Sequence, residues 1–300
     1  MSTDVTIRPA TIGDVPRLLA LSNACDRSWF GRDETDADEV EQRLRLAGDL
    51  DQRTRVIESP AGLIGYAVFF GSHDTQLMVA PDLAVAQRRE TEDELLGWLI
   101  AAGADHLEAP SQATGLLAAF ARHGFTPAWS SFELERTPAA AYPDVPLPAG
   151  VEVRPFDPDD HARAVHTLLY RFWSEVPSHN HRGFDEWREL FLGHASFDPS
   201  QQVVAWRGDR PVGAAICRMY TEDTGWILQL GVAPEDRGRG LGRALLVAAS
   251  QRLGAVAGVA TIGLSVFARN VRALQLYRSV GFEVTREWVT CQRTPVAPTS

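Results

Sequence analysis

Apolar and polar residues follow the same order of patterns in the two halves of the chain. The strand-like segment Val5-Thr6-Ile7-Arg8-Pro9 precedes leucines at helical spacing, and Val151-Glu152-Val153-Arg154-Pro155 precedes a second helical series. These segments lie 146 residues apart (151 − 5). Near the end of each half, a helical pattern ends at Gly124-Phe125 or Gly281-Phe282, which is typical of a glycine C-cap followed by a strand. The pattern predicts two copies of one α/β unit, with chance similarity of short segments as the alternative.

Prolines interrupt the pattern between the two copies, at Pro138, Pro143, Pro146 and Pro148. Proline at this density is incompatible with a packed helix or a central strand, because it lacks the backbone donor that both require. We therefore expect a first domain at residues 1–137, a proline-rich linker at 138–150, a second domain at 151–293 and a tail at 294–300.

A glycine-rich turn follows the third predicted strand of the second half. The pattern predicts strands at 202–206, 212–219 and 226–232, then Ala233-Pro234-Glu235-Asp236-Arg237-Gly238-Arg239-Gly240-Leu241-Gly242-Arg243, then an apolar helix at 244–253. A strand, a glycine turn and a helix N-terminus are typical of a phosphate-binding site, because exposed N–H groups and the helix dipole favour an anion. The glycine spacing matches neither a dinucleotide-binding turn nor a P-loop, and a flexible hairpin tip is the alternative.

A second motif begins with a strand predicted at 261–266. Asn270 follows it at a position suited to cap a helix, which we expect to end near Val280 with Gly281 as its terminator. Four residues at helical spacing form the inward stripe of that helix: Ala273, Leu276, Tyr277 and Val280.

Together these two motifs resemble the GCN5-related N-acetyltransferase (GNAT) superfamily. The residues that carry the resemblance are Val232-x-Pro234-x-x-Arg237-Gly238-x-Gly240-Leu241-Gly242 and Leu264-x-Val266-x-x-x-Asn270-x-x-Ala273-x-x-x-Tyr277-x-x-x-Gly281-Phe282. The resemblance implies an α/β fold of two tandem domains, each a mixed, mostly antiparallel central sheet flanked by helices. The duplicated layout is similar to that of tandem members such as mycothiol synthase.

The resemblance also implies that the strand at 226–232 diverges from the strand at 261–266 and leaves a wedge for the pantetheine arm of acetyl-CoA, the acyl donor. The donor would be held by the backbone of the third strand, by the glycine loop and by the following strand and helix. The residues concerned are Leu230, Gly231, Val232, Arg237, Gly238, Arg239, Gly240, Leu241, Gly242, Arg243, Asn270, Ala273 and Tyr277. Tyr277 is the candidate acid that protonates the leaving thiolate, and a tyrosine packed for structural reasons is the alternative.

The general base is left open by the sequence. Many relatives carry a carboxylate on the strand that leads into the loop, and mycothiol synthases carry one near its start, where this chain has Trp226. Glu222 and Asp223, just before the strand, are the candidate bases, with solvated turn carboxylates as the alternative.

The acceptor is expected to contact the segment Phe172-Trp173-Ser174-Glu175-Val176-Pro177-Ser178-His179-Asn180-His181, which varies in this superfamily. Glu175 is placed to pair with a cationic amine, and Trp173 and Trp226 are aromatic candidates for the same site, with a core role as the alternative. His179 and His181 have no third ligand at a usable spacing, so no metal is expected.

The first half has lost both motifs. The residues expected in its loop, from Ala86 to Glu94, contain no glycine and are rich in acidic groups, whose carboxylates would repel a pyrophosphate. Ala113-Thr114-Gly115 lies where an asparagine cap is expected. Phe120 stands where Tyr277 stands in the second half. We interpret the first half as a degenerate domain without acetyl-CoA, with a second acyl-CoA site as the alternative.

Composition narrows the class of protein. The 300 residues carry a formal charge of −10, which argues against nucleic acid or an anionic membrane as partner. Three separated cysteines indicate reduced thiols, and the absence of a long apolar run or a signal-like N-terminus argues against a membrane span and a secretory signal. We expect a cytoplasmic monomer or homodimer.

The sequence therefore predicts an N-acetyltransferase that moves acetyl from acetyl-CoA to a primary amine of a small molecule, by direct attack in a ternary complex. A mycothiol synthase-type enzyme and a protein N-terminal or lysine acetyltransferase are alternatives. A non-catalytic acyl-CoA-binding module is a further alternative, which the missing strand carboxylate favours and the retained Tyr277 opposes.

Overall fold

The computed structural model describes residues 5–71, 74–138, 141–173 and 183–293. Its contacts divide the chain into two compact units, residues 1–131 with 287–300 and residues 132–286. The division falls inside two long strands, so the domain boundaries expected from the sequence stay predictions. The candidate residue Glu175 and the tail at 294–300 lie outside the described residues, as does the side chain of Trp173.

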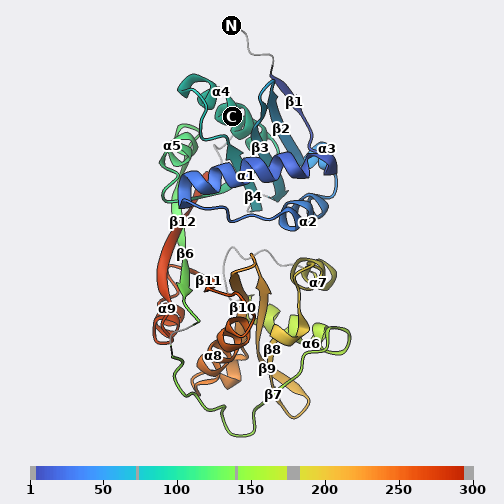
Figure 1. The fold of residues 1–300 in the computed structure, drawn as a ribbon, viewed down its shortest axis with the longest axis vertical. Coiled ribbons are helices and arrows are strands. Elements are labelled where there is room, and N and C mark those ends of the chain that lie inside the picture. Colours follow the sequence, from blue (N-terminus) through green and yellow to red (C-terminus); the bar gives the residue numbers. More distant parts are fainter. Residues whose placement is uncertain (1–4, 72–73, 139–140, 174–182, 294–300) are drawn as a thin grey trace, which may run out of the picture. The chain divides into compact units, whose positions relative to one another are not determined.

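The same order of elements occurs twice: a strand, two helices, three strands, a helix, a strand, a helix and a strand (Figure 1). Short additional helices are α3 (Leu50–Arg53) and the 3₁₀ helices η1 (Ile12–Asp14), η2 (Pro199–Gln201) and η3 (Pro234–Asp236). In the first copy the elements are β1 (Thr6–Arg8), α1 (Val15–Phe30), α2 (Ala37–Ala47), β2 (Thr54–Ser59), β3 (Gly62–Gly71), β4 (Asp74–Val79), α4 (Val85–Ala101), β5 (His106–Pro110), α5 (Thr114–Arg122) and β6 (Phe125–Arg136). In the second copy they are β7 (Glu152–Arg154), α6 (Pro158–Trp173), α7 (Phe184–Leu192), β8 (Val203–Arg207), β9 (Arg210–Met219), β10 (Thr224–Val232), α8 (Leu241–Gly254), β11 (Thr261–Phe267), α9 (Val271–Arg278) and β12 (Glu283–Arg293).

The strands of the first unit are antiparallel neighbours in the order β1-β2-β3-β4, and β5 pairs with the last part of β12. One continuous apolar cluster packs α1, α2, α4 and α5 against these strands. Leu18 of α1 and Leu95 and Leu99 of α4 are almost fully buried in it. The unit thus has a core of its own.

In the second unit the strand order is β6-β11-β10-β9-β8-β7; β10 and β11 run parallel, and the pairs from β10 to β7 are antiparallel. Side chains that alternate along β9 enter two different clusters, as expected for a sheet covered on both faces. Ala215 and Cys217 pack with α8 and α9, whereas Ala214 and Ile216 pack with α6 and α7. This mixed, mostly antiparallel sheet between helical layers confirms the predicted fold class.

Helix bounds differ slightly from the sequence expectation where a cap decides them. Helix α8 begins at Leu241 directly after Gly240, and α9 ends at Arg278 rather than Val280, with Gly281 at a φ of +88°. The larger difference lies in the first unit, where the acidic residues from Glu90 to Glu94 belong to the body of α4 and not to a loop.

Candidate functional site

Strands β10 and β11 separate halfway along β10. They pair in register from Thr224 with Thr261 to Ile227 with Leu264, and residues after Ile227 have no partner in β11. An irregularity in the pairing with β9, between Ile227 and Gln229, accompanies the separation. Extra residues in a strand bend it away from its neighbour. The segment Leu230–Val232 is therefore a strand edge that faces the gap, as a ligand that adds a strand requires.

The glycine loop follows this edge directly. Gly238 and Gly240 have φ values of +77° and +86°, a conformation that strains any other residue. Within the described residues, the backbone N–H groups of residues 238–242 donate to no carbonyl or side chain. Five consecutive unpartnered donors at a helix N-terminus are suited to bind an anion.

The arginines of the loop have different environments. Arg237 donates from Nε to the carbonyl of Val232 at 3.1 Å, and Arg243 donates to the carbonyl of Ser279 at 3.0 Å. The enclosed Nε of Arg243 has no hydrogen-bond partner within the described part of the chain, whereas Arg239 is exposed. Two arginines thus fix the loop to its strand and to α9, and the third extends into solvent.

Asp236 holds the other end of the loop. Its carboxylate is buried and pairs with Arg207 and Arg210 at 3.0 Å each, while the neighbouring Glu235 is half-exposed and pairs with Arg210. Both carboxylates next to the loop are therefore neutralised by arginines of the β8–β9 turn, which leaves the loop itself cationic. Sequence analysis missed this network, because it depends on the tertiary contact between two turns.

Replacing Asp236 by asparagine should lower the free energy of unfolding. Removing one partner of a buried ion pair costs about 3–5 kcal/mol, and the partial exposure of both arginines reduces the expected loss to about 2 kcal/mol. The matched change Glu235→Gln removes an exposed carboxylate and should cost under about 0.5 kcal/mol. Urea unfolding of both variants measures the difference, and equal losses would contradict this assignment.

Helix α9 brings Tyr277 next to the loop. A methyl group placed on Gly242 would lie 3.6 Å from Leu276, so the start of α8 packs closely on α9. Asn270 caps α9 by accepting a hydrogen bond from the N–H of Ala273 at 3.1 Å. Tyr277 is buried, and burial raises its pKa to about 12. Its hydroxyl makes no hydrogen bond within the described residues, so the phenol is protonated and available as a donor.

The structure does not bring Glu222 and Asp223 to this end of β10. Asp223 accepts hydrogen bonds from Thr221 and Thr224, and its carbonyl accepts from Ala260 and Thr261. A strand rises about 3.3 Å per residue, so the turn lies roughly 20 Å along β10 from Gln229. Contact of either carboxylate with the reacting atoms stays a prediction that would require intervening water.

Trp226 lies on the face of β10 that is opposite α8. Its ring covers Gly263 of β11, where a Cβ atom would lie 2.0 Å from it, and it packs beside Tyr220. On the same face, Gln229 accepts a hydrogen bond from the indole of Trp187 at 2.8 Å. Helices α8 and α9 cover one face of the sheet, and α6 and α7 pack on the face that carries Trp226 and Gln229. Gln229 was not predicted, because its partner lies 42 residues away in the chain.

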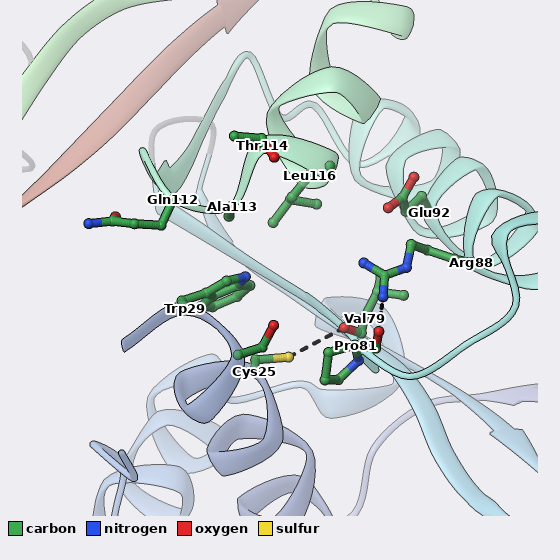
Figure 2. A pocket seen from close by; sticks show the side chains of 12 residues that line it. Cys25, Trp29, Val79, Pro81, Arg88, Glu92, Gln112, Ala113, Thr114 and Leu116 are labelled. Atoms are coloured by element: carbon green, nitrogen blue, oxygen red, sulfur yellow. Dashed lines mark hydrogen bonds between the residues drawn. The ribbon is translucent and has the colours of Figure 1, made fainter. Parts of the chain in front are cut away.

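The corresponding place in the first unit is a pocket of about 180 Å³ (Figure 2). Figure 2 shows Cys25 and Trp29 of α1 on one side and Thr114 and Leu116 of α5 on the other, with Arg88 between. The guanidinium of Arg88 donates to the carbonyl of Pro81, the loop has no glycine, and α5 has no side-chain cap at Ala113. Typical ligand pockets have at least about 300 Å³. The absence of acetyl-CoA from this half stays a prediction.

Two properties of the described residues limit other classes of site. None of their helices is both long and apolar enough to cross a membrane. Their histidines, cysteines and carboxylates form no group of three or more that could hold a metal ion, and His179 and His181 lie outside the described part.

Comparisons with known proteins agree with this geometry. The model of the acetyltransferase (GNAT) family matches residues 162–282. A mycothiol acetyltransferase of Kineococcus radiotolerans is 35% identical over 295 residues, which cover 90% of each chain. Another, from Geodermatophilus obscurus, is 30% identical and covers 91% of each chain.

Solved structures show the same fold. A GCN5-related N-acetyltransferase from Sphaerobacter thermophilus superposes with a TM-score of 0.74 at 22% identity, over 97% of both chains. A tandem GNAT protein from the clavulanic acid biosynthesis pathway has a TM-score of 0.74 at 17% identity, over 98% of this chain and all of that one. These findings confirm the resemblance that the two motifs indicated and the tandem layout. The chain therefore belongs to the GNAT family as a tandem member, and it is an N-acetyltransferase of a family whose acetyl donor is acetyl-CoA.

Proposed function

We propose that the second unit transfers the acetyl group of acetyl-CoA to the primary amine of a small molecule, by direct attack in a ternary complex. The observation that carries the proposal is the glycine loop at residues 238–242, with its unpartnered N–H groups, at the end of a strand that separates from its neighbour. A pyrophosphate on the loop and an extended pantetheine arm along Leu230–Val232 fit these two features together.

The chain's own groups then serve the transfer. The amine nitrogen attacks the thioester carbon, so that an N–C bond forms, the C–S bond breaks and the amine gives up a proton. A backbone N–H near Leu230 stabilises the charge that develops on the thioester oxygen. The departing thiolate takes its proton from Tyr277, which regains one from solvent.

The proton of the amine leaves through water in this proposal. Strand β10 carries no carboxylate, and Glu222 and Asp223 lie at its far end. We retain these two residues as proton acceptors that act through water. A neutral amine is then the reactive form, so that the rate rises with pH until the amine is deprotonated.

A mycothiol-type reaction is the second candidate, because the relatives with 30–35% identity over about nine-tenths of the chain carry the name mycothiol acetyltransferase. The presence of Trp226 in place of an acidic residue argues against it. Because of these relatives, the panel of amines in the test below includes cysteinyl-glucosaminyl-inositol.

Thermal unfolding with acetyl-CoA, followed by thiol release across a panel of amines, tests the proposal. Acetyl-CoA at 100 times its Kd should stabilise the fold by about 2.7 kcal/mol. Thiol release with a small amine is the expected result. Stabilisation without release from any amine would favour a non-catalytic module, release only with peptides would favour a protein acceptor, and no stabilisation would exclude all of these functions.

A further inference from the structure

Arg218, near the end of β9, is a buried cation without an internal partner. The residue is 6% exposed, and its enclosed Nε lacks a hydrogen-bond partner. Within the described residues it forms no ion pair and donates no hydrogen bond, and its contact is with the ring of Tyr220, 5.0 Å from the guanidinium carbon. Arginine is almost never buried to this degree unless it is paired, because desolvating the charge is unfavourable.

Arg136 provides a direct comparison, because it is the other buried arginine among the described residues. Its guanidinium donates to the carbonyls of Val280 and Thr137 and stacks on Tyr142 at 3.9 Å. Among the described residues, one buried guanidinium thus has carbonyl acceptors and the other has only an aromatic ring. An anion from outside the protein would supply the acceptors that Arg218 lacks there.

The position of Arg218 connects it to the acceptor. Along β9, Ala214 and Ile216 face α6 and α7, and Arg218 continues this series. Its partner across the sheet is Trp226, on the face opposite α8. Trp226 and Gln229 are three residues apart, or about 10 Å along the strand. Arg218 thus lies next to Trp226 on the face that also carries Gln229, and about 10 Å along the strand is a span that one small molecule can cover.

From this placement we infer that Arg218 binds a carboxylate of the acceptor, which is therefore a small amine that also carries a carboxylate, such as an amino acid. This inference rests on the proposed function and names the class of its acceptor. A planar guanidinium matches a carboxylate in a two-point hydrogen bond. A single cation also suits one negative charge better than a phosphate, whose second charge would require a further donor. The acetylated nitrogen loses its charge in the product, and the carboxylate is unchanged.

Matched pairs of amines test the inference: 4-aminobutyrate with butylamine, 6-aminohexanoate with hexylamine, and serine with ethanolamine. The wild type should prefer the carboxylate-bearing member of at least one pair by about tenfold or more in kcat/KM. The change Arg218→Gln should remove that preference by raising the KM of the carboxylate-bearing amine, with the KM of acetyl-CoA unchanged. Arg218→Lys should retain part of the preference, because it keeps the charge without the planar fork.

The control is Arg163→Gln, which removes an exposed arginine that also stacks on a ring, that of Phe184 at 4.1 Å. It should leave the preference intact. Equal use of both members of every pair by the wild type would overturn the inference. Equal losses of kcat/KM for both members of a pair in Arg218→Gln would also overturn it. The same holds if the wild type acetylates cysteinyl-glucosaminyl-inositol faster than every carboxylate-bearing amine and Arg218→Gln does not change that rate.

Two further measurements separate this inference from the proposed function. Arg218→Gln should raise or preserve the midpoint of thermal unfolding, whereas Arg136→Gln should lower it. A similar drop of the midpoint in both variants would mean that Arg218 has a structural role and would overturn the inference.

If no amine is acetylated, the amino acids are titrated into the protein with CoA present. Binding that requires Arg218 would then support the inference and contradict the proposed function, and binding independent of Arg218, or no binding, would overturn the inference.

Discussion

Replacing Gly240 by alanine should weaken acetyl-CoA binding about tenfold. Gly240 has a φ of +86°, and the left-handed conformation costs a residue with a Cβ atom about 1–2 kcal/mol. The alanine relieves this strain by leaving the conformation, which turns the N–H groups of the loop away from their common direction. Acetyl-CoA must then restore the strained loop, and about 1.4 kcal/mol corresponds to a tenfold rise in Kd. Calorimetric titration of both proteins with acetyl-CoA measures this change in Kd.

Gly258→Ala is the matched control. Gly258 has a φ of +90°, and a methyl group there would meet nothing closer than the carbonyl of Glu222 at 3.8 Å. It carries the same backbone strain in the turn before β11, at the opposite end of β10 from the glycine loop. The Gly258→Ala variant should be less stable than the wild type and should bind acetyl-CoA with an unchanged Kd. A similar rise in Kd for both variants would mean that strain alone is responsible and that the loop does not bind the pyrophosphate.

Tyr277→Phe should lower kcat about tenfold or more, because the change removes the proposed proton donor to the thiolate. The hydroxyl makes no hydrogen bond within the described residues, so its loss should leave the free energy of unfolding and the Kd of acetyl-CoA nearly unchanged. Burial raises the pKa of Tyr277 to about 12, so the donor remains protonated at neutral pH and loses its proton only near that value. The rate should therefore not fall between about pH 7 and 10 through ionisation of this group.

Tyr142→Phe is the control for this change. Tyr142 donates to the carbonyl of Ser250 at 3.1 Å, so its loss removes a hydrogen bond of the fold. It should lower stability by about 1 kcal/mol and leave kcat unchanged. Steady-state kinetics of both variants decide the matter, since an unchanged kcat for Tyr277→Phe would exclude Tyr277 from the mechanism.

The sequence predicted the parts of the site that depend on local chemistry. The loop around Gly240 and the cap at Asn270 each involve residues within a few positions of one another, so spacing and residue type were enough to locate them. The separation of β10 from β11 was expected from the family resemblance, but its position after Ile227 does not follow from the residues alone, because it is a property of three strands together. The lack of a hydrogen-bond partner at Arg218 could not be predicted either, because an arginine in a strand normally reaches solvent or a carboxylate.

The acidic residues of the first unit also show that tertiary contacts cannot be read from the sequence. The acidic run from Glu90 to Glu94 was interpreted as a loop that repels phosphate, whereas Glu92 and Asp93 lie in α4 and pair with Arg122 of α5. The charge argument was incomplete, because the sequence does not reveal which carboxylates are neutralised. That this half lacks acetyl-CoA stays a prediction, which now depends on the missing glycines and the missing helix cap rather than on charge.

The most direct test follows an isotopically labelled acetyl group from acetyl-CoA to the acceptor by mass spectrometry. With the best amine of the panel, we predict one labelled acetyl group on the amine nitrogen for each CoA released, and about tenfold or more slower formation of both products in Tyr277→Phe. Release of CoA without a labelled amine, or label that stays on acetyl-CoA with every amine, would contradict the account.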